Sequence, residues 1–312
     1  MDCIVTSPPY WGLRDYGTAQ WEGGNPNCEH KKSRFNYAIS DKQKSNLGSS
    51  GLGSYKNNET CKCGAKRIDS QLGLEKKITD YVNNLADVFD ECKRVLKKTG
   101  TAWLNIGDSY AQKGLKAKDL CLIPFRVALE LQQRGWYVRS DIIWHKPNPM
   151  PESVKDRPTK SHEHIFLLSK SKNYYYDADT VREPCQEETK RRMILGNKGK
   201  IGKNKNSPGW KQLNKYWGSK QSKIDILKGR NKRDVWTITT KPYKEAHFAT
   251  FPKDLIEPCI KAGCPENGVV LDPFAGSGTV GEVAKELQKD FILIELNPEY
   301  IKLIEKRVNK LL

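Results

Sequence analysis

The stretch Val269–Thr279 has the sequence VVLDPFAGSGT. Its first three residues form a short apolar run, which is typical of a buried strand. The segment Gly276-Ser277-Gly278 permits a tight turn and a close approach of ligand to backbone, and a helix is expected from Thr279. Glu295 ends the next expected strand, where nucleoside sites place a carboxylate on ribose hydroxyls. The stretch therefore predicts the ligand-binding edge of an α/β sheet.

The loop in this stretch also limits the kind of ligand. No lysine follows the glycines, and the third glycine of a dinucleotide fingerprint is absent. Both features disfavour phosphate-bearing ligands such as ATP or NAD. A nucleoside without phosphates, such as S-adenosylmethionine, suits the loop better. The alternative is a structural strand–helix turn that binds nothing.

A second motif, Thr6-Ser7-Pro8-Pro9-Tyr10-Trp11, follows an apolar run at residues 2–5 that predicts another strand. The two prolines stiffen the loop and remove two N–H donors, which leaves carbonyl groups to accept from a ligand. A serine hydroxyl and a carbonyl can accept both N–H groups of an exocyclic amine, and Tyr10 offers a face for an extruded base. The motif predicts a nucleobase site at Ser7, Pro8, Pro9 and Tyr10. A proline-terminated strand in an unrelated loop is the alternative.

The rest of the chain alternates strand and helix patterns. Apolar residues recur every three or four positions from Ile78 to Leu96, before Gly100, and predict a helix that begins near Glu75. Further helices are expected at about 119–134, 253–261, 279–288 and 298–310, and strands at 101–106, 137–144, 165–169, 269–271 and 291–295. This alternation predicts an α/β fold with a largely parallel sheet covered on both faces.

Positive charge is concentrated in one part of the chain. The net charge is +17, and residues 185–233 contain 15 Lys and Arg against 3 Asp and Glu. Such a local field attracts a polyanion. Aromatic residues suited to base stacking accompany it, namely Trp210, Tyr216, Trp217 and Trp236. A solvated, partly disordered loop is the alternative.

The strings DPFAGSGT and TSPPYW resemble motif I and motif IV of the S-adenosylmethionine-dependent DNA amino-methyltransferases. Their order, with the basic segment between them, resembles that of the β class. The resemblance implies a Rossmann-like methyltransferase fold with a mixed, mainly parallel seven-stranded sheet, circularly permuted motif order and insertions. It implies direct methyl transfer to a flipped base. SPPY is more typical of methylation at cytosine N4 than at adenine N6, which remains the alternative.

Residue roles follow from the same resemblance. The cofactor would contact the loop after the strand that ends at Leu271. Glu295 would bind the ribose of the cofactor. Phe251, within an element at residues 247–252, would lie near the methionine end of the cofactor. The predicted loop contacts are Asp272, Pro273, Phe274, Ala275, Gly276, Ser277, Gly278 and Thr279. The predicted DNA contacts in the basic segment are Lys190, Arg191, Arg192, Lys211, Lys215, Arg230 and Arg233.

The expected organisation is a catalytic domain made of residues 1–24, 68–184 and 236–312. Residues 25–67 would be an insertion and residues 185–235 a target-recognition region. Relatives carry some 20 residues before the first strand, with an acidic element beside the cofactor adenine, whereas this chain starts at that strand. This difference motivates a rival interpretation, a non-catalytic DNA-binding protein on a decayed methyltransferase scaffold. Methylation of a protein glutamine amide is a third, which the basic segment disfavours.

The nine cysteines are an odd number in a chain without a recognisable secretion signal, which favours free thiols or metal ligands over disulfides. Cys28 and His30 form one pair in the insertion, and Cys61 and Cys63 form another. Two such pairs separated by a loop predict a structural Cys₃His zinc site, with unrelated free thiols as the alternative. Cys185 and Cys259 each follow a proline but do not follow a strand, so neither is expected to be a nucleophile.

Partners and location are expected from the same features. The expected partner is double-stranded DNA, bound by a monomer or homodimer that is accompanied by a cognate restriction endonuclease. No apolar run approaches the length of a membrane span. The chain is therefore expected in the cytoplasm of a prokaryote or a phage-infected cell. His145, His162 and His164 are expected to be satisfied by polar neighbours, and Asp108 and Ser109 are expected to border the site.

Overall fold

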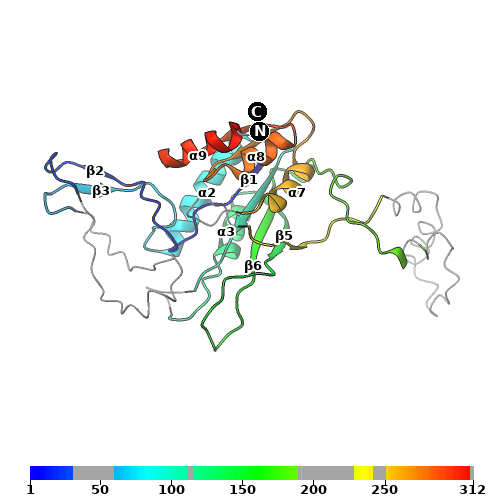
Figure 1. Cartoon of the computed structure of the whole chain (residues 1–312), viewed down its shortest axis with the longest axis horizontal. Coiled ribbons are helices and arrows are strands. Elements are labelled where there is room, and N and C mark those ends of the chain that lie inside the picture. The colour runs from blue at the N-terminus through cyan, green and yellow to red at the C-terminus, as the bar shows by residue number, and fades with distance from the viewer. Residues whose placement is uncertain (31–59, 111–115, 189–190, 192–227, 242–250, 310–312) are drawn as a thin grey trace.

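The computed structural model describes residues 1–30, 60–110, 116–188, 191, 228–241 and 251–309 (Figure 1). Most of the 25–67 insertion and most of the basic segment lie outside these residues. Four predicted DNA contacts (Lys190, Arg192, Lys211 and Lys215) therefore lie outside them, as do three of the basic segment's aromatic residues and residues 247–250.

Within the described residues, seven strands form one sheet in the order β7-β5-β6-β4-β1-β8-β9. Strand β6 runs antiparallel to both of its neighbours, and the other neighbouring pairs are parallel. The predicted mixed, mainly parallel seven-stranded sheet is confirmed. The strands are β1 (Cys3–Thr6), β4 (Thr101–Ile106), β5 (Tyr137–His145), β6 (His162–Ser169), β7 (Val235–Thr237), β8 (Val269–Asp272) and β9 (Asp290–Leu293).

Helices cover both faces of the sheet (Figure 1). Helices α2 (Ile78–Val95) and α3 (Ile123–Gln133) pack on one face, and α7 (Lys253–Gly263) and α8 (Thr279–Glu286) pack on the other. Helix α9 (Pro298–Asn309) lies against α8. Alternation along β1 separates the two cores, since Ile4 joins the α2–α3 side while Cys3 and Val5 join the α7–α8 side. Among the described residues, no helix is long and apolar enough to cross a membrane.

Two helices show how sequence sets their ends. Helix α2 buries residues at steps of three and four, as predicted, and stops before Leu96, whose backbone is extended. Helix α3 begins at Ile123, four residues later than expected. Leu122 has a left-handed backbone with φ of 55°, and a proline occupies the first turn. Asp108 Oδ1 accepts the Ile123 N–H at 3.1 Å, so this carboxylate anchors the start of α3.

Strand β7 was not among the predicted strands, because it has only three residues and one of them is buried. That buried residue is Trp236, which is 6 % exposed and packs in the α7–α8 core. The expectation that Trp236 stacks on nucleic-acid bases is therefore wrong. Its indole N–H donates to the Arg233 carbonyl at 2.6 Å, which closes the end of the basic segment onto the sheet.

A separate antiparallel pair of strands extends from the main body, formed by β2 (Gln20–Glu22) and β3 (Lys66–Ile68) (Figure 1). We call this pair the β2–β3 hairpin, although residues 23–65 separate its strands. Its strand residues are exposed or half-buried. A two-stranded hairpin of this kind has little stability of its own in water. It needs other contacts at its tip or its base.

Strands β1, β4 and β8 are parallel neighbours, so their carboxyl ends lie at one edge of the sheet. The loop that begins at Ser7 follows β1, and the loop that begins at Pro273 follows β8. Antiparallel β6 begins at the same edge. This edge is where open α/β sheets bind their ligands.

Candidate active site

The two motifs predicted from the ends of the chain meet through one hydrogen bond. The Thr6 hydroxyl donates to Asp272 Oδ1 at 2.6 Å, and the Phe274 N–H donates to the same oxygen at 3.0 Å. Asp272 is fully buried, and burial raises the pKa of its carboxyl to about 7. Its second oxygen, Oδ2, is also buried and has no hydrogen-bond partner among the described residues. A buried acceptor without a partner is costly unless a ligand satisfies it.

The loop after β8 is open on one side. Gly276 and Gly278 have φ of 52° and 79°, a region that favours glycine. A Cβ on Gly276 would meet only the Phe274 carbonyl oxygen, at 4.0 Å. The Gly276 N–H donates to Glu295 Oε2 at 2.8 Å, and the Asn297 N–H donates to Glu295 Oε1 at 2.8 Å. The predicted loop and its acid are therefore next to each other.

Other predicted cofactor contacts take structural roles. Arg307 Nη1 in α9 donates to the Ser277 hydroxyl at 2.8 Å and to the Thr279 hydroxyl at 2.9 Å, and all three residues are buried. Ala275 is buried, and its N–H donates to the Ile294 carbonyl at 2.9 Å. These contacts fix the loop to α9 and to the residue after β9, so Asp272, Gly276 and Glu295 are the polar groups of the loop left to face a ligand. Phe251 is half-buried against the α7–α8 core.

The loop after β1 is held from several sides. The Tyr81 hydroxyl of α2 donates to the Pro9 carbonyl at 2.9 Å, and Trp11 Nε1 donates to the Glu75 carbonyl at 2.9 Å. The Pro9 carbonyl is thus already bonded, contrary to the expectation that the carbonyls of this loop are left for a ligand. Pro8 is buried and Ser7 is half-buried at the sheet edge. Ser7 and the Pro8 carbonyl are the candidate acceptors for an amine.

Tyr10 has a defined place beside them. A Cβ on Gly107 would lie 2.5 Å from Tyr10 Cε2, so the ring lies directly on the backbone after β4. The Tyr10 hydroxyl donates to Glu163 Oε2 at 2.7 Å and lies 3.3 Å from Asn105 Oδ1, and the Ser7 hydroxyl donates to it at 3.4 Å. Burial and the negative charge of Glu163 raise the pKa of Tyr10 well above its ordinary value.

Three residues of this network were not predicted from the sequence: Asn105, Lys146 and Glu163. Asn105 Nδ2 donates to Glu163 Oε2 at 3.2 Å, and Lys146 forms an ion pair with Glu163 Oε1. The Lys146 and Glu163 side chains are 19 % and 16 % exposed, so the pair is shielded from solvent. One structural feature points to Glu163. Strand β6 is antiparallel to β4 and β5, so β6 begins at the sheet edge where the carboxyl ends of those two strands lie.

All three neighbouring histidines were expected to have polar partners, and two of them do. His164 Nδ1 lies 2.9 Å from Asp141 Oδ1, and His145 Nδ1 lies 3.2 Å from the Thr237 hydroxyl. His162 contacts the ring of His164. Cys259 is buried within α7, where burial raises the pKa of its thiol, and Cys185 is half-buried. The polar side chains that remain as candidates beside the loop after β1 are those of Ser7, Tyr10 and Glu163.

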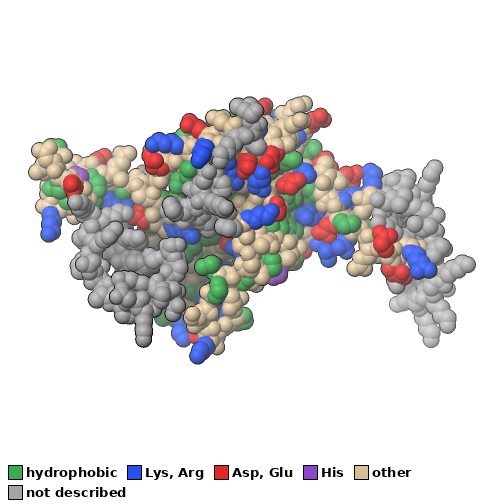
Figure 2. Space-filling model, in the orientation of Figure 1, with side chains coloured by type: hydrophobic (Ala, Val, Ile, Leu, Met, Phe, Trp, Pro, Cys, Tyr) green, Lys and Arg blue, Asp and Glu red, His purple; other side chains and the backbone are tan. Residues whose placement is uncertain are grey.

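The described side chains of the basic segment at residues 185–233 are partly neutralised. Arg230 Nε and Arg233 Nε both bond Glu183 Oε2, at 3.2 and 2.9 Å. Arg191 is exposed. Over α7, α8 and α9, Lys and Arg side chains alternate with Asp and Glu (Figure 2). The charge excess of the chain therefore belongs mainly to residues 185–233.

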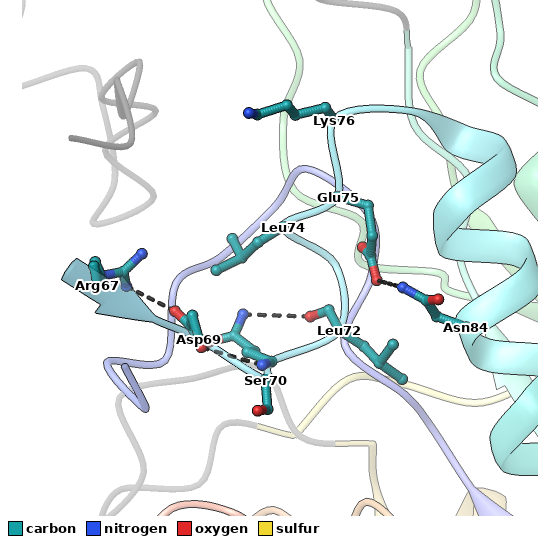
Figure 3. Close-up of a pocket in the computed structure, with 9 residues that line it drawn as sticks. Arg67, Asp69, Ser70, Leu72, Leu74, Glu75, Lys76 and Asn84 are labelled. Atoms are coloured by element: carbon teal, nitrogen blue, oxygen red, sulfur yellow. Dashed lines mark hydrogen bonds and ion pairs between the residues drawn. The ribbon is translucent and has the colours of Figure 1, made fainter. Parts of the chain in front are cut away.

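The four predicted metal ligands also come together. The ligand atoms of Cys28, His30, Cys61 and Cys63 all lie within 4.8 Å of one another. A separate pocket of about 390 Å³ lies at the base of the β2–β3 hairpin, lined by Arg67, Asp69 and Glu75 among others (Figure 3). It lies beside α2 and next to the loop after β1, because Trp11 of that loop donates to the carbonyl of Glu75, which lines the pocket.

Comparisons with known proteins agree with this geometry. A family model described as a DNA methylase, of the N6 and N4 methyltransferases, matches residues 1–306. The chain is 39% identical to the type II methyltransferase M.Cfr9I of Citrobacter freundii, over 98% of this chain and 80% of that protein. It is 38% identical to M.SmaI of Serratia marcescens, over 98% and 84%. The solved PvuII DNA methyltransferase, described as cytosine-N4-specific, has a similar fold with a TM-score of 0.57 at 17% identity, covering 98% of this chain and 79% of that one.

Proposed function

Because the chain belongs to the DNA methylase family of N6 and N4 amino-methyltransferases, we propose that it methylates the N4 amine of cytosine in duplex DNA. The methyl donor would be S-adenosylmethionine, and the cytosine would flip out of the helix to reach it. The bond from Thr6 to Asp272 carries the proposal, because it fixes the base loop to the cofactor loop. The resemblance predicted from the two motifs is confirmed at the level of the family.

The residues after β8 fit S-adenosylmethionine. Glu295 presents a carboxylate beside the open Gly276 backbone, where ribose hydroxyls would donate to it. Asp272 Oδ2 is a buried acceptor that lacks a partner among the described residues, and a donor on the cofactor would satisfy it. No group in this loop is cationic, as suits a ligand without phosphates. When bound, the cofactor supplies a methyl group activated by a sulfonium.

The residues after β1 would hold the base. The Ser7 hydroxyl and the Pro8 carbonyl would accept the two N–H groups of the amine, which orients its lone pair toward the methyl group. Tyr10 would stack on the flipped ring. Its hydroxyl is already bonded to Glu163, so the ring is held in place before the base arrives. Holding the two reactants in this orientation, together with electrostatic stabilisation, would supply the rate acceleration.

Serine is the observation that favours cytosine over adenine. In the family that the motifs resemble, SPPY at Ser7–Tyr10 is more typical of N4 methylation than of N6 methylation, and one solved methyltransferase with a similar fold is described as cytosine-N4-specific. The two proposed acceptors are neutral, and the Glu163 carboxylate beside Tyr10 is already bonded by Tyr10, Asn105 and Lys146. The N4 choice rests on these residues.

The test of this choice is nucleoside mass spectrometry of mixed-sequence DNA treated with the purified chain and S-adenosylmethionine. N4-methyldeoxycytidine is the expected product, formed about 100-fold more slowly by the Tyr10→Ala variant purified in parallel. N6-methyldeoxyadenosine instead would overturn the choice of base. No methylated nucleoside, together with intact DNA binding and no cofactor binding in calorimetry, would favour the non-catalytic DNA-binding interpretation.

The recognition region is also a proposal. We propose that residues 185–235 recognise the DNA target sequence. Methylation of that sequence would protect it from a cognate type II endonuclease. Glu183 and Arg230 exchange two backbone hydrogen bonds, of 2.9 and 2.8 Å, so both ends of the segment meet at one point of the core. A segment with joined ends and most of the chain's excess charge suits phosphate contacts.

Glu163 gives a prediction of its own. Glu163→Gln keeps the size of the side chain but removes the charge that pairs with Lys146 and orients Tyr10. We expect kcat/KM for DNA to fall about tenfold, since one charged hydrogen bond of this kind contributes about 1.5–3 kcal/mol. Cofactor affinity should stay unchanged, because Glu163 does not line the cofactor loop.

The control for that variant is Glu130→Gln. Glu130 lies in α3 and pairs with Arg134 away from the motif loops. It carries the same change of charge at a half-buried glutamate. Equal kinetics for Glu163→Gln and the control in single-turnover methylation would show that Glu163 does not position Tyr10.

A further inference from the structure

Two ligand pairs far apart in the sequence form one compact cluster. Cys28 Sγ lies 3.7 Å from Cys61 Sγ, and Cys63 Sγ lies 3.4 Å from His30 Nδ1. Ligand atoms around a tetrahedral Zn²⁺, with bonds of about 2.0–2.3 Å, are separated by about 3.3–3.8 Å. Both close pairs already have this spacing. A disulfide has sulfurs about 2.05 Å apart, and all nine cysteines are free.

The backbone around the cluster is shaped for these side chains. The Cys61 N–H donates to the Ala65 carbonyl at 2.7 Å, and the Gly64 N–H donates to the Cys61 carbonyl at 2.9 Å, which makes a tight turn carrying both cysteines. Backbone N–H groups of Asn25 and Ala65 point to Cys63 Sγ. A Cβ on Gly24 would lie 2.8 Å from the same sulfur, so only glycine allows the two turns to approach.

The histidine is oriented by its neighbour. The Trp21 ring of β2 stacks on His30 with centroids 5.3 Å apart and an angle of 21°. Nδ1 is the ring nitrogen that faces Cys63. Groups that fix the orientation of a ligand are typical of metal sites. Three thiols and one imidazole are the donor set of closed structural zinc sites rather than of catalytic ones.

We infer that Cys28, His30, Cys61 and Cys63 bind one structural zinc ion that holds the β2–β3 hairpin together. The hairpin has too little buried apolar surface to be stable alone: its strand residues are exposed or half-buried, and Ala65 is the buried residue of its turn. Zinc binding would supply the missing free energy.

The base of this hairpin leads toward the cofactor loop. Arg67 of β3 pairs with Asp15 at 3.1 Å and with Asp69 at 2.7 Å, and these three side chains are shielded from solvent (Figure 3 shows the pair with Asp69). Gln71 Oε1 accepts the Tyr16 N–H at 2.7 Å, and Gln71 Nε2 donates to the Arg14 carbonyl at 2.7 Å.

The chain of contacts then reaches the predicted ribose acid. The Tyr16 carbonyl accepts from Asn297 Nδ2 at 3.2 Å, and the Asn297 N–H is bonded to Glu295. The hairpin therefore positions residues 14–16 against the residue that orients Glu295. If the proposed cofactor role of Glu295 holds, loss of zinc would also weaken cofactor binding. The metal site itself does not depend on that role.

The test is metal analysis of the purified full-length chain. We expect about one zinc per chain in the wild type, and less than about 0.2 in Cys61→Ser and in Cys63→Ser. Cys185→Ser is the matched control, because Cys185 is half-buried and lies outside the cluster, and it should keep about one zinc. Less than about 0.2 zinc in the wild type, after expression with added zinc, would overturn the inference.

A second measurement serves if the serine variants do not fold. Wild-type chain reconstituted with Co²⁺ should show thiolate charge-transfer absorption and the intense visible bands of a tetrahedral site, which Zn²⁺ then abolishes. Weak bands typical of six oxygen ligands would contradict the site. Neither readout uses methyl transfer, so failure of the zinc site and failure of the proposed activity are distinguishable.

Discussion

Tyr10→Ala should reduce methyl transfer to DNA about 100-fold while S-adenosylmethionine binds as well as to the wild type. Stacking of one base on an aromatic ring is worth about 1–3 kcal/mol, and the variant also leaves Glu163 without the Tyr10 hydroxyl. The cofactor loop follows a different strand, so its affinity is not affected. Pro8→Ala should show the same pattern, because it loosens the carbonyl that accepts the amine. Single-turnover methylation and calorimetry measure the two quantities.

One further variant separates the ring of Tyr10 from its hydroxyl, and another is a control at a different tyrosine. Tyr10→Phe keeps the ring and removes only the hydroxyl, so the expected loss is about tenfold. Tyr137→Ala removes a tyrosine that is 45% exposed on β5, and it should leave transfer unchanged. Near-normal transfer by both Tyr10→Ala and Pro8→Ala would refute the assignment of this loop to the base.

Glu295→Ala has the second large effect, on the cofactor. The carboxylate would accept from two ribose hydroxyls, and hydrogen bonds to charged groups contribute about 1.5–3 kcal/mol each. The Kd for S-adenosylmethionine should therefore rise by about 100-fold or more, since each 1.4 kcal/mol is about tenfold. Calorimetry on the full-length chain measures it. Methyl transfer should recover in part at high cofactor concentration.

The control for that prediction is Glu299→Ala. Glu299 is exposed in the first turn of α9 and pairs with Lys302. The Glu299→Ala variant therefore removes the same charge close to the site without changing the loop after β8. Its Kd should match the wild type. A Glu295→Ala protein with the melting temperature and the cofactor Kd of the wild type would place the ribose elsewhere.

The parts of the site that follow strand ends could be predicted from sequence. Asp272 ends one expected strand and Ser7 follows the end of another, and the carboxyl ends of parallel strands share an edge. That rule is enough to bring two motifs together from opposite ends of the chain. The same rule gives the seven-stranded sheet only with help from the family resemblance, because β7 is too short to show a pattern.

The parts of the site that depend on strand direction and register could not be predicted from the sequence. Glu163 reaches Tyr10 because β6 runs antiparallel to β4 with Asn105 opposite Ile165, and strand direction is not written in local periodicity. The hydroxyls of Ser277 and Thr279 bond Arg307 in the last helix, a contact between elements that single-sequence patterns do not pair. The carbonyls of the loop after β1 were expected to be free for a ligand, but the Tyr81 hydroxyl of α2 already bonds the Pro9 carbonyl.

The position of β1 between β4 and β8 has a consequence for biosynthesis. Strand β1 is an inner strand of the sheet, and its edge toward β8 stays unpaired until residues 269–272 are made. Pairings between such distant residues form late and leave a strand edge open to other chains in the meantime. A chain released early would lack Asp272 and the partner of Thr6. The bond that joins the two motif loops can therefore form only after residue 272 has been made, and shorter products would lack it.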